Sequence, residues 1–113
     1  MSASRILPSL AVAIAVLAAP LAHAADTPEF ALTIKDHKFE PAELKVPVGK
    51  RVKLVVHNQD STPEEFESHS MNREKVIPGG AKASIFIGPL KAGRYQFFGE
   101  FHEKTAQGAV VAE

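Results

Sequence analysis

The sequence predicts an all-β fold, an antiparallel sandwich or barrel of short strands. Large and small side chains alternate with a period of two in several segments, which is typical of strands with one buried face. These segments recur about every ten residues, with Gly and Pro between them, a spacing that favours a sandwich over a helical bundle. The predicted strands are residues 30–34, 44–48, 52–57, 83–87, 95–98 and 109–112.

The N-terminus predicts export. Arg5 precedes an uncharged apolar run over residues 6–22, which closes on the small-x-small sequence Ala22-His23-Ala24. This order is typical of a cleaved secretory signal peptide. An uncleaved anchor is the alternative, since roughly 17 apolar residues just span a bilayer. We expect a signal peptide over residues 1–24 and a single domain over 25–113, in the periplasm and without stable membrane insertion after cleavage.

Composition excludes several kinds of site. The chain has 13 Lys and Arg against 13 Asp and Glu, so no basic face for nucleic acid is indicated. It has no cysteine, which excludes thiol nucleophiles, zinc–thiolate sites, iron–sulfur clusters and copper–thiolate centres. No nucleophile–base–acid triad or phosphate-binding glycine loop is visible. Any catalysis would therefore depend on a bound metal.

A metal site is predicted where the aromatic segment 93–102 ends. Glu100 and His102 are two residues apart, so on an extended backbone they lie on the same face and can converge on one ion. Imidazole is the commonest metal-binding side chain, which makes His102 the strongest candidate ligand. His57 is interpreted as a strand-end residue that hydrogen-bonds a loop, and His37 as a structural residue or a distant contributor.

Residues 60–71 are predicted to include a short helical turn and to supply further ligands. Ser61 or Thr62 suits an N-cap, Pro63 the first helical position, and the following acids a capping box. Glu65 and His69 are four residues apart and share one helical face. If the segment is extended instead, Glu65, Glu67, His69 and Met71 share one face. The predicted metal ligands are thus His102, Glu100, Glu65, Glu67 and His69.

The pattern also resembles a known family. The order V-G-x-x-V-x-L-x-V-x-N-x-D at residues 48–60, G-x-Y-x-F-x-x-x-x-H at 93–102 and a terminal G-x-V-V at 108–111 resembles the cupredoxin fold. Residues 60–68 and 97–102 are similar to cupredoxin-like periplasmic proteins of the EfeO N-terminal and FtrB type, which accompany ferrous-iron permeases. The resemblance implies a Greek-key sandwich or barrel of about seven strands, and an iron permease or other uptake component as partner.

The chain departs from blue-copper cupredoxins at the site itself. Those proteins use a Cys-x-x-His pair, a later Met and an earlier His. The corresponding residues here are Gly99, His102, Ala106 or Gln107, and Glu64 or Glu65. Carboxylate and imidazole ligands favour Cu(II), Fe(III), Mn(II) or Zn(II) over Cu(I). The expected cofactor is a copper or iron ion, and the expected role is Fe(II) oxidation or electron transfer in iron uptake.

Two other functions fit the same residues. His69 and Met71 would suit a copper carrier, since a thioether helps to hold Cu(I). A metal-free interaction module, whose acidic loop docks a basic partner, is equally compatible with a β-sandwich.

Overall fold

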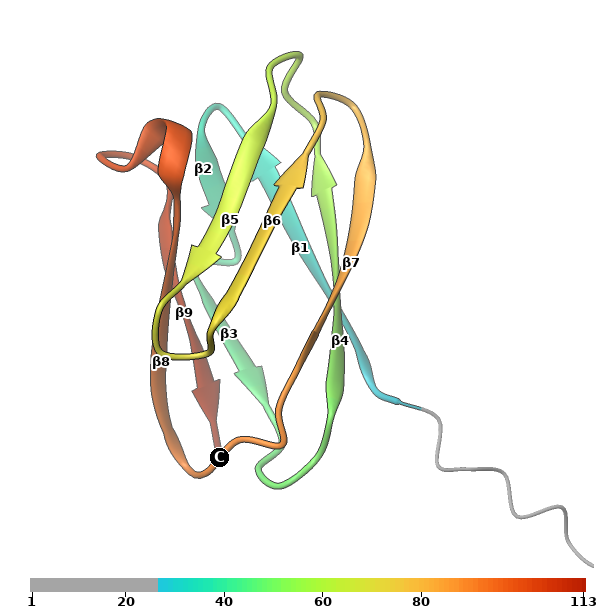
Figure 1. Cartoon of the computed structure of the whole chain (residues 1–113), viewed down its shortest axis with the longest axis vertical. Coiled ribbons are helices and arrows are strands. Elements are labelled where there is room, and N and C mark those ends of the chain that lie inside the picture. The colour runs from blue at the N-terminus through green and yellow to red at the C-terminus, as the bar shows by residue number, and fades with distance from the viewer. Residues whose placement is uncertain (1–26) are drawn as a thin grey trace, which may run out of the picture.

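The computed structural model describes residues 27–113, which form a two-sheet β-sandwich (Figure 1). The first sheet has the order β2-β1-β4-β7 and the second β3-β9-β8-β5-β6. The strands are β1 (Glu29–Lys35), β2 (Lys38–Glu40), β3 (Glu43–Val46), β4 (Val52–Asn58), β5 (Glu64–Ser68), β6 (Arg73–Ile77), β7 (Lys82–Ile87), β8 (Gly93–Gly99) and β9 (Gln107–Ala112). One 3-10 turn, η1 (Glu100–His102), follows β8. The signal peptide predicted for residues 1–24 lies outside the described residues.

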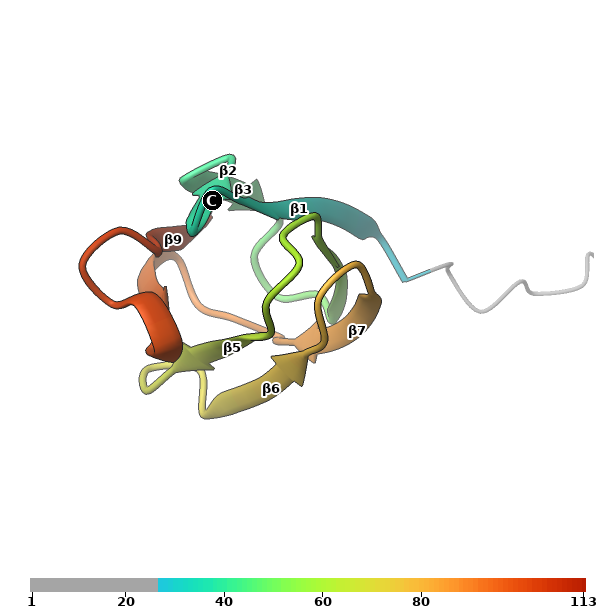
Figure 2. The ribbon, with the colours of Figure 1, turned by 90° about the horizontal axis from the view of Figure 1, so that it is seen from above.

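Period-two burial explains why these segments are strands. In β4 every second residue is buried, so Val52, Leu54 and Val56 enter the core while the residues between them face outward. The core is centred on three phenylalanines, Phe39, Phe66 and Phe97, whose ring centroids lie 4.9 to 6.1 Å apart. Figure 2 shows the strands of the two sheets curving around this space. The predicted all-β fold is confirmed.

The sheets are mixed, where a purely antiparallel arrangement was predicted. β1 runs parallel to β4, and β3 runs parallel to β9. The described residues contain nine strands, not about seven, because the short β2 and β6 are also paired. The predicted edge strand at residues 44–48 is confirmed as β3, but it ends at Val46, and Val48 is 41% exposed.

The helical turn predicted within residues 61–71 is wrong. Residues 64–68 form β5, which pairs with β6 on one side and β8 on the other. The cause is tertiary: Phe66 is fully buried and stacks on Phe97 at 5.0 Å, and only a strand also points Glu64 and Ser68 inward with it. A local capping pattern is weaker than the burial of a phenylalanine, which contributes roughly 1.5–3 kcal/mol.

Candidate metal centre

The β1–β2 turn, the start of β5 and η1 meet at one end of the sandwich, the upper end in Figure 1. Three side chains converge there. His37 comes from the turn, Glu64 from the first position of β5, and His102 from the last position of η1. Each offers a ligand atom within 4.8 Å of the other two.

Glu64 is the buried centre of this cluster. The alternation of β5 points its side chain into the sandwich, where only 1% of the residue remains exposed. One carboxylate oxygen, Oε1, accepts hydrogen bonds from the backbone N–H groups of Glu65 at 3.0 Å and Phe101 at 2.9 Å. The other, Oε2, lies 2.5 Å from Nδ1 of His102. A buried carboxylate is stable only with such partners.

The carboxylate of Glu64 fills the space that a side chain at position 99 would need. A Cβ atom on Gly99 would lie 2.6 Å from Cδ of Glu64 and 2.7 Å from Cβ of Ala106. In the resemblance to blue-copper cupredoxins, Gly99 stands where the Cys would be, and Ala106 or Gln107 falls near the Met position. The small residues at these two positions therefore leave room for an oxygen ligand.

The two imidazoles of the cluster are stacked. The ring centroids of His37 and His102 lie 3.6 Å apart, with an interplanar angle of 12°. Nδ1 of His37 lies 3.4 Å from Oδ2 of Asp60, while Nδ1 of His102 faces Glu64. The side chain of His37 is 42% exposed and that of His102 is 29% exposed, so a cation can reach both rings from solvent.

Two imidazoles and a carboxylate suit a borderline divalent cation. Nitrogen and oxygen donors of this kind bind Cu(II), Zn(II) and Fe, and without a thiolate they favour Cu(II) over Cu(I). The residues at this end of the sandwich therefore fit a copper ion without any cysteine.

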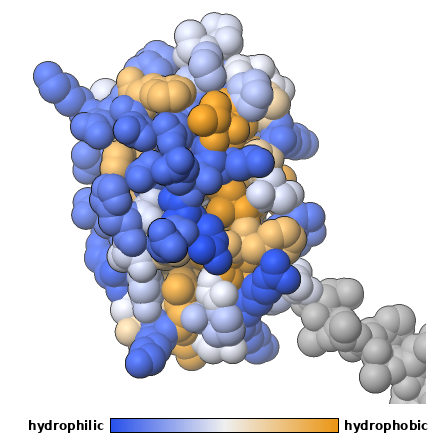
Figure 3. Space-filling view, in the orientation of Figure 1, coloured by the Kyte–Doolittle hydropathy of each residue, from blue (hydrophilic) through white to orange (hydrophobic). Residues whose placement is uncertain are grey.

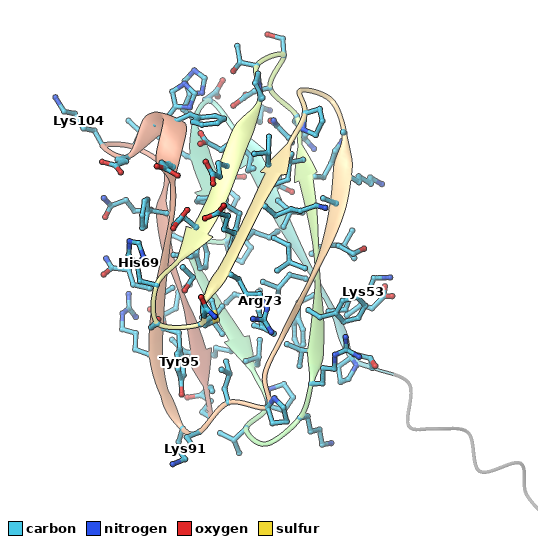
Figure 4. All side chains as sticks on the ribbon, in the orientation of Figure 1. Lys53, His69, Arg73, Lys91, Tyr95 and Lys104 are labelled. Atoms are coloured by element: carbon cyan, nitrogen blue, oxygen red, sulfur yellow. The ribbon has the colours of Figure 1, made fainter. Side chains whose placement is uncertain are left out.

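A second cluster lies on the other face of β5. Glu65 and Glu67 alternate with Glu64 and so point outward, and Glu100 joins them from η1. One ligand oxygen from each lies within 4.8 Å of the other two. Figure 3 shows that the visible face of the sandwich is largely hydrophilic, and Figure 4 shows oxygen-tipped side chains gathered along β5.

The carboxylates of this second cluster repel one another. A side-chain hydrogen bond with Glu100, with further contributions from burial and from nearby acids, raises the pKa of Glu65 to about 7. Burial and the charge of Glu74 raise the pKa of Glu67 as well. Oε2 of Glu67 is buried and has no hydrogen-bond partner in the described residues. Bound positive charge would relieve this repulsion.

The predicted ligands are thus divided between two places. His102 joins Glu64 and His37, whereas Glu65, Glu67 and Glu100 form the other cluster. The expectation that Glu100 and His102 share a face is wrong, because residues 100–102 form a 3-10 turn and not the end of a strand.

His69 lies at the margin of the second cluster. Its Nδ1 is 3.7 Å from Oε1 of Glu67, its side chain is 80% exposed, and its ring lies 5.4 Å from that of Phe98. Figure 4 shows it on the side of the sandwich formed by β5 and β8. Met71, the thioether of the carrier hypothesis, is 8% exposed within the core cluster.

His37 and Glu64 were not among the candidate ligands predicted from the sequence. Either Glu64 or Glu65 was expected near the position of the first His of blue-copper sites. A strand over residues 64–68 would have distinguished them, because it points Glu64 inward and Glu65 outward. His37 carried a weaker signal, as a histidine in a tight turn where glycine is favoured. Within the aromatic segment 93–102, Phe97 is buried in the core but Phe101 is 49% exposed.

Three comparisons place the fold. The family model described as a cupredoxin-like domain matches residues 8–112. An uncharacterized protein of Rickettsia prowazekii (strain Madrid E), RP394, is 47% identical over 83 residues, 74% of this chain and 66% of that protein. The chain therefore spans just under two thirds of this relative.

Among solved structures, auracyanin A, a "blue" copper protein from Chloroflexus aurantiacus, gives a TM-score of 0.65 at 14% identity, covering 75% of this chain and 98% of that one. The metal-binding domain of the Cu(I)-exporting P-type ATPase CopA of Streptococcus pneumoniae D39 gives 0.64 at 16% identity, covering 75% and 84%. At these identities the likeness shows the fold alone. Over residues 27–113, no helix has the length and apolarity needed to cross a membrane.

Proposed function

The chain belongs to the cupredoxin-like domain family, and we propose that it is a periplasmic metal-binding protein that holds Cu(II) between His37, Glu64 and His102. One observation carries this proposal. Two stacked imidazoles and a buried carboxylate from three separate elements converge at one end of the sandwich, with Glu64 in the space next to Gly99. Copper-binding proteins are among the structural neighbours, which supports copper as the ion.

The donor set determines which chemistry the ion can perform. The carboxylate is harder than a thiolate and stabilises the higher oxidation state, so this centre would favour Cu(II). By intrinsic affinity a nitrogen and oxygen site also binds Cu(II) more tightly than Fe(II) or Zn(II). A bound copper ion here would supply a one-electron acceptor.

The resemblance to the EfeO and FtrB type supports a role in iron uptake. We propose that the protein assists Fe(II) oxidation or electron transfer before an inner-membrane permease or another uptake component takes up the iron. The all-oxygen cluster of Glu65, Glu67 and Glu100 suits iron better than copper, because carboxylates are hard ligands. Iron is then substrate and copper the resident ion.

A copper carrier is the second candidate, and the openness of the site favours it. A groove of about 480 Å³ opens over the two imidazoles. It is lined by His37 and by residues 100–105, which include His102. Partly exposed imidazoles let an incoming donor reach the ion, which transfer to another protein requires. Because Met71 is buried, this carrier would not rely on its thioether.

Copper binding can be tested with single variants. The apo protein is titrated with Cu(II) against a chelator of known affinity, and the bound form is examined by electron paramagnetic resonance. We expect nitrogen and oxygen ligation in the wild type. His102→Ala should weaken binding by more than the roughly 10- to 100-fold that loss of an outer-sphere partner causes. His57→Ala, on the outer face of β4, is the matched control. An unchanged spectrum in His102→Ala contradicts the proposed centre.

The iron role needs a separate measurement. Stopped-flow absorbance follows Fe(II) loss with and without one equivalent of Cu(II), in the wild type and in Glu65→Gln/Glu67→Gln. We expect copper to accelerate Fe(II) loss in the wild type, and the double variant to lose the acceleration but keep its copper spectrum. Copper binding without acceleration would favour the carrier.

A further inference from the structure

The turn that carries His37 is strained. Asp36 and His37 are the two central residues of the β1–β2 hairpin, in which Lys35 pairs with Lys38. Their φ angles are 52° and 56°, in the left-handed region. A two-residue turn with both angles positive strongly favours Asn-Gly, because a Cβ atom is crowded there. A histidine at the second position is therefore unfavourable for the turn itself.

A single carboxylate holds this turn. Oδ1 of Asp60 accepts a hydrogen bond from the backbone N–H of Asp36 at 2.8 Å, and Oδ2 accepts one from that of His37 at 3.0 Å. Oδ2 also lies 3.4 Å from Nδ1 of the His37 ring. These three contacts fix both the backbone and the ring of the turn. Asp60 lies 23 to 24 residues after the turn along the chain.

Asp60 is itself fixed by the sandwich. Its backbone N–H donates to Oδ1 of Asn58 at 3.0 Å, and its carbonyl accepts from the N–H of Gly80 at 2.9 Å. Asn58 is fully buried, and its side-chain amide donates to two backbone carbonyls. The N-x-D sequence at the end of β4 therefore forms a rigid support beneath the turn.

We infer that Asp60 is a positioning residue that holds the strained turn so that the imidazole of His37 stays stacked on His102, where each ring offers a nitrogen to the proposed copper site. The effect of Asp60 on Cu(II) binding rests on the proposed function. The stack itself is a property of the apo protein. Retaining a histidine where glycine suits the backbone is explained if the imidazole is needed at that point.

The first test uses the apo protein and needs no metal. Stacked rings shift each other's proton resonances, so ¹H NMR reports the pair directly. Asp60→Asn keeps the size of the side chain but removes one of the two acceptor oxygens, and it should move the ring resonances of His37 and His102 toward those of free histidine. Glu40→Gln, an exposed carboxylate on β2, should leave them unchanged. Unmoved resonances in folded Asp60→Asn overturn the inference.

The second test asks whether Asp60 acts through His37. Asp60→Asn should raise the dissociation constant for Cu(II) about 10- to 100-fold, as loss of an outer-sphere partner does. In a His37→Gly background the same change should have no further effect, because the ring it positions is absent. An equal loss in both backgrounds would show that Asp60 does not act through His37.

The strain is measured by comparing two variants that lack the ring. His37→Gly should melt several degrees above His37→Ala, because glycine adopts the positive φ freely. Equal melting temperatures contradict the strain. If only the proposed function fails, the wild type binds no Cu(II). The ring resonances of His37 and His102 in the metal-free protein would still change in Asp60→Asn.

Discussion

Gly99→Ala adds one methyl group where the buried carboxylate of Glu64 lies. Gly99 has φ −91° and ψ 112°, an extended conformation that alanine adopts without strain. The effect of this substitution is therefore steric. The new Cβ would lie 2.6 Å from Cδ of Glu64 and 2.7 Å from Cβ of Ala106, although carbon atoms pack at roughly 3.5–4.0 Å.

The overlap of about 1 Å sets the size of the effect. Overpacking a core typically costs about 1–3 kcal/mol. If Glu64 moves away, it also leaves the N–H groups of Glu65 and Phe101 without their acceptor, at about 1–3 kcal/mol for each one that stays buried. A gain of about 0.4–1 kcal/mol from the stiffer unfolded chain offsets part of this. We expect a net loss of about 2–4 kcal/mol, and a melting temperature lower by about 10–25 °C.

Thermal unfolding followed by circular dichroism measures the loss, and a Cu(II) titration of the folded variant measures the site. Gly80→Ala is a comparison for backbone strain alone, since its Cβ would meet nothing within 4 Å but its φ of 74° disfavours alanine, whereas Gly99→Ala carries the steric cost without that strain. Combining Gly99→Ala with Glu64→Ala should remove the clash with Glu64 but not the one with Ala106, so the double variant should be more stable than the sum of the single effects predicts. A melting temperature for Gly99→Ala within about 3 °C of wild type would refute the packing argument.

Three further outcomes are expected. The free energy of unfolding should fall as pH rises from about 4.5 to about 7, because Glu65 with its raised pKa keeps in the folded state a proton that the unfolded chain has released. Glu100→Gln should flatten this dependence in urea titrations at pH 5, 6, 7 and 8, whereas Glu103→Gln should not. Asn58→Ala should lose about 2–4 kcal/mol in urea unfolding, since the buried carbonyl of Ile77 and the part-buried carbonyl of Thr62 both lose their donor. Glu64→Gln, which keeps an acceptor oxygen, should destabilise the fold less than Glu64→Ala.

The sandwich was predictable because its strands are encoded locally. The alternation in residues 52–57 depends on side chains within one segment, and the structure places Val52, Leu54 and Val56 on the buried face. The family resemblance was carried by similarly local motifs. The segment of β5 was predicted wrongly, because Pro63 and the acids after it look like a helix start and the packing of Phe66 on Phe97 favours a strand.

The grouping of the ligands was not predictable from one segment. His102 and Glu64 are 38 residues apart, and their contact depends on the 3-10 turn after β8. That turn is set by non-local bonds, in which the N–H of Gly99 donates to Ala106 and the N–H of Phe101 donates to Glu64. The spacing of Glu100 and His102 alone therefore indicated the right residue types but the wrong partners.

The two clusters share the same two elements, and this ties their geometries together. β5 gives Glu64 to one cluster and Glu65 to the other, and η1 gives His102 and Glu100 in the same way. Phe101 lies between Glu100 and His102 in η1, and its backbone N–H donates a hydrogen bond to Oε1 of Glu64 at 2.9 Å. A movement of Glu64 that breaks this bond would remove one of the contacts that hold η1, and with it Glu100, against β5. The His37–Glu64–His102 cluster and the carboxylate cluster therefore share one buried side chain, and we expect a ligand that moves Glu64 in the first to alter the charge repulsion in the second.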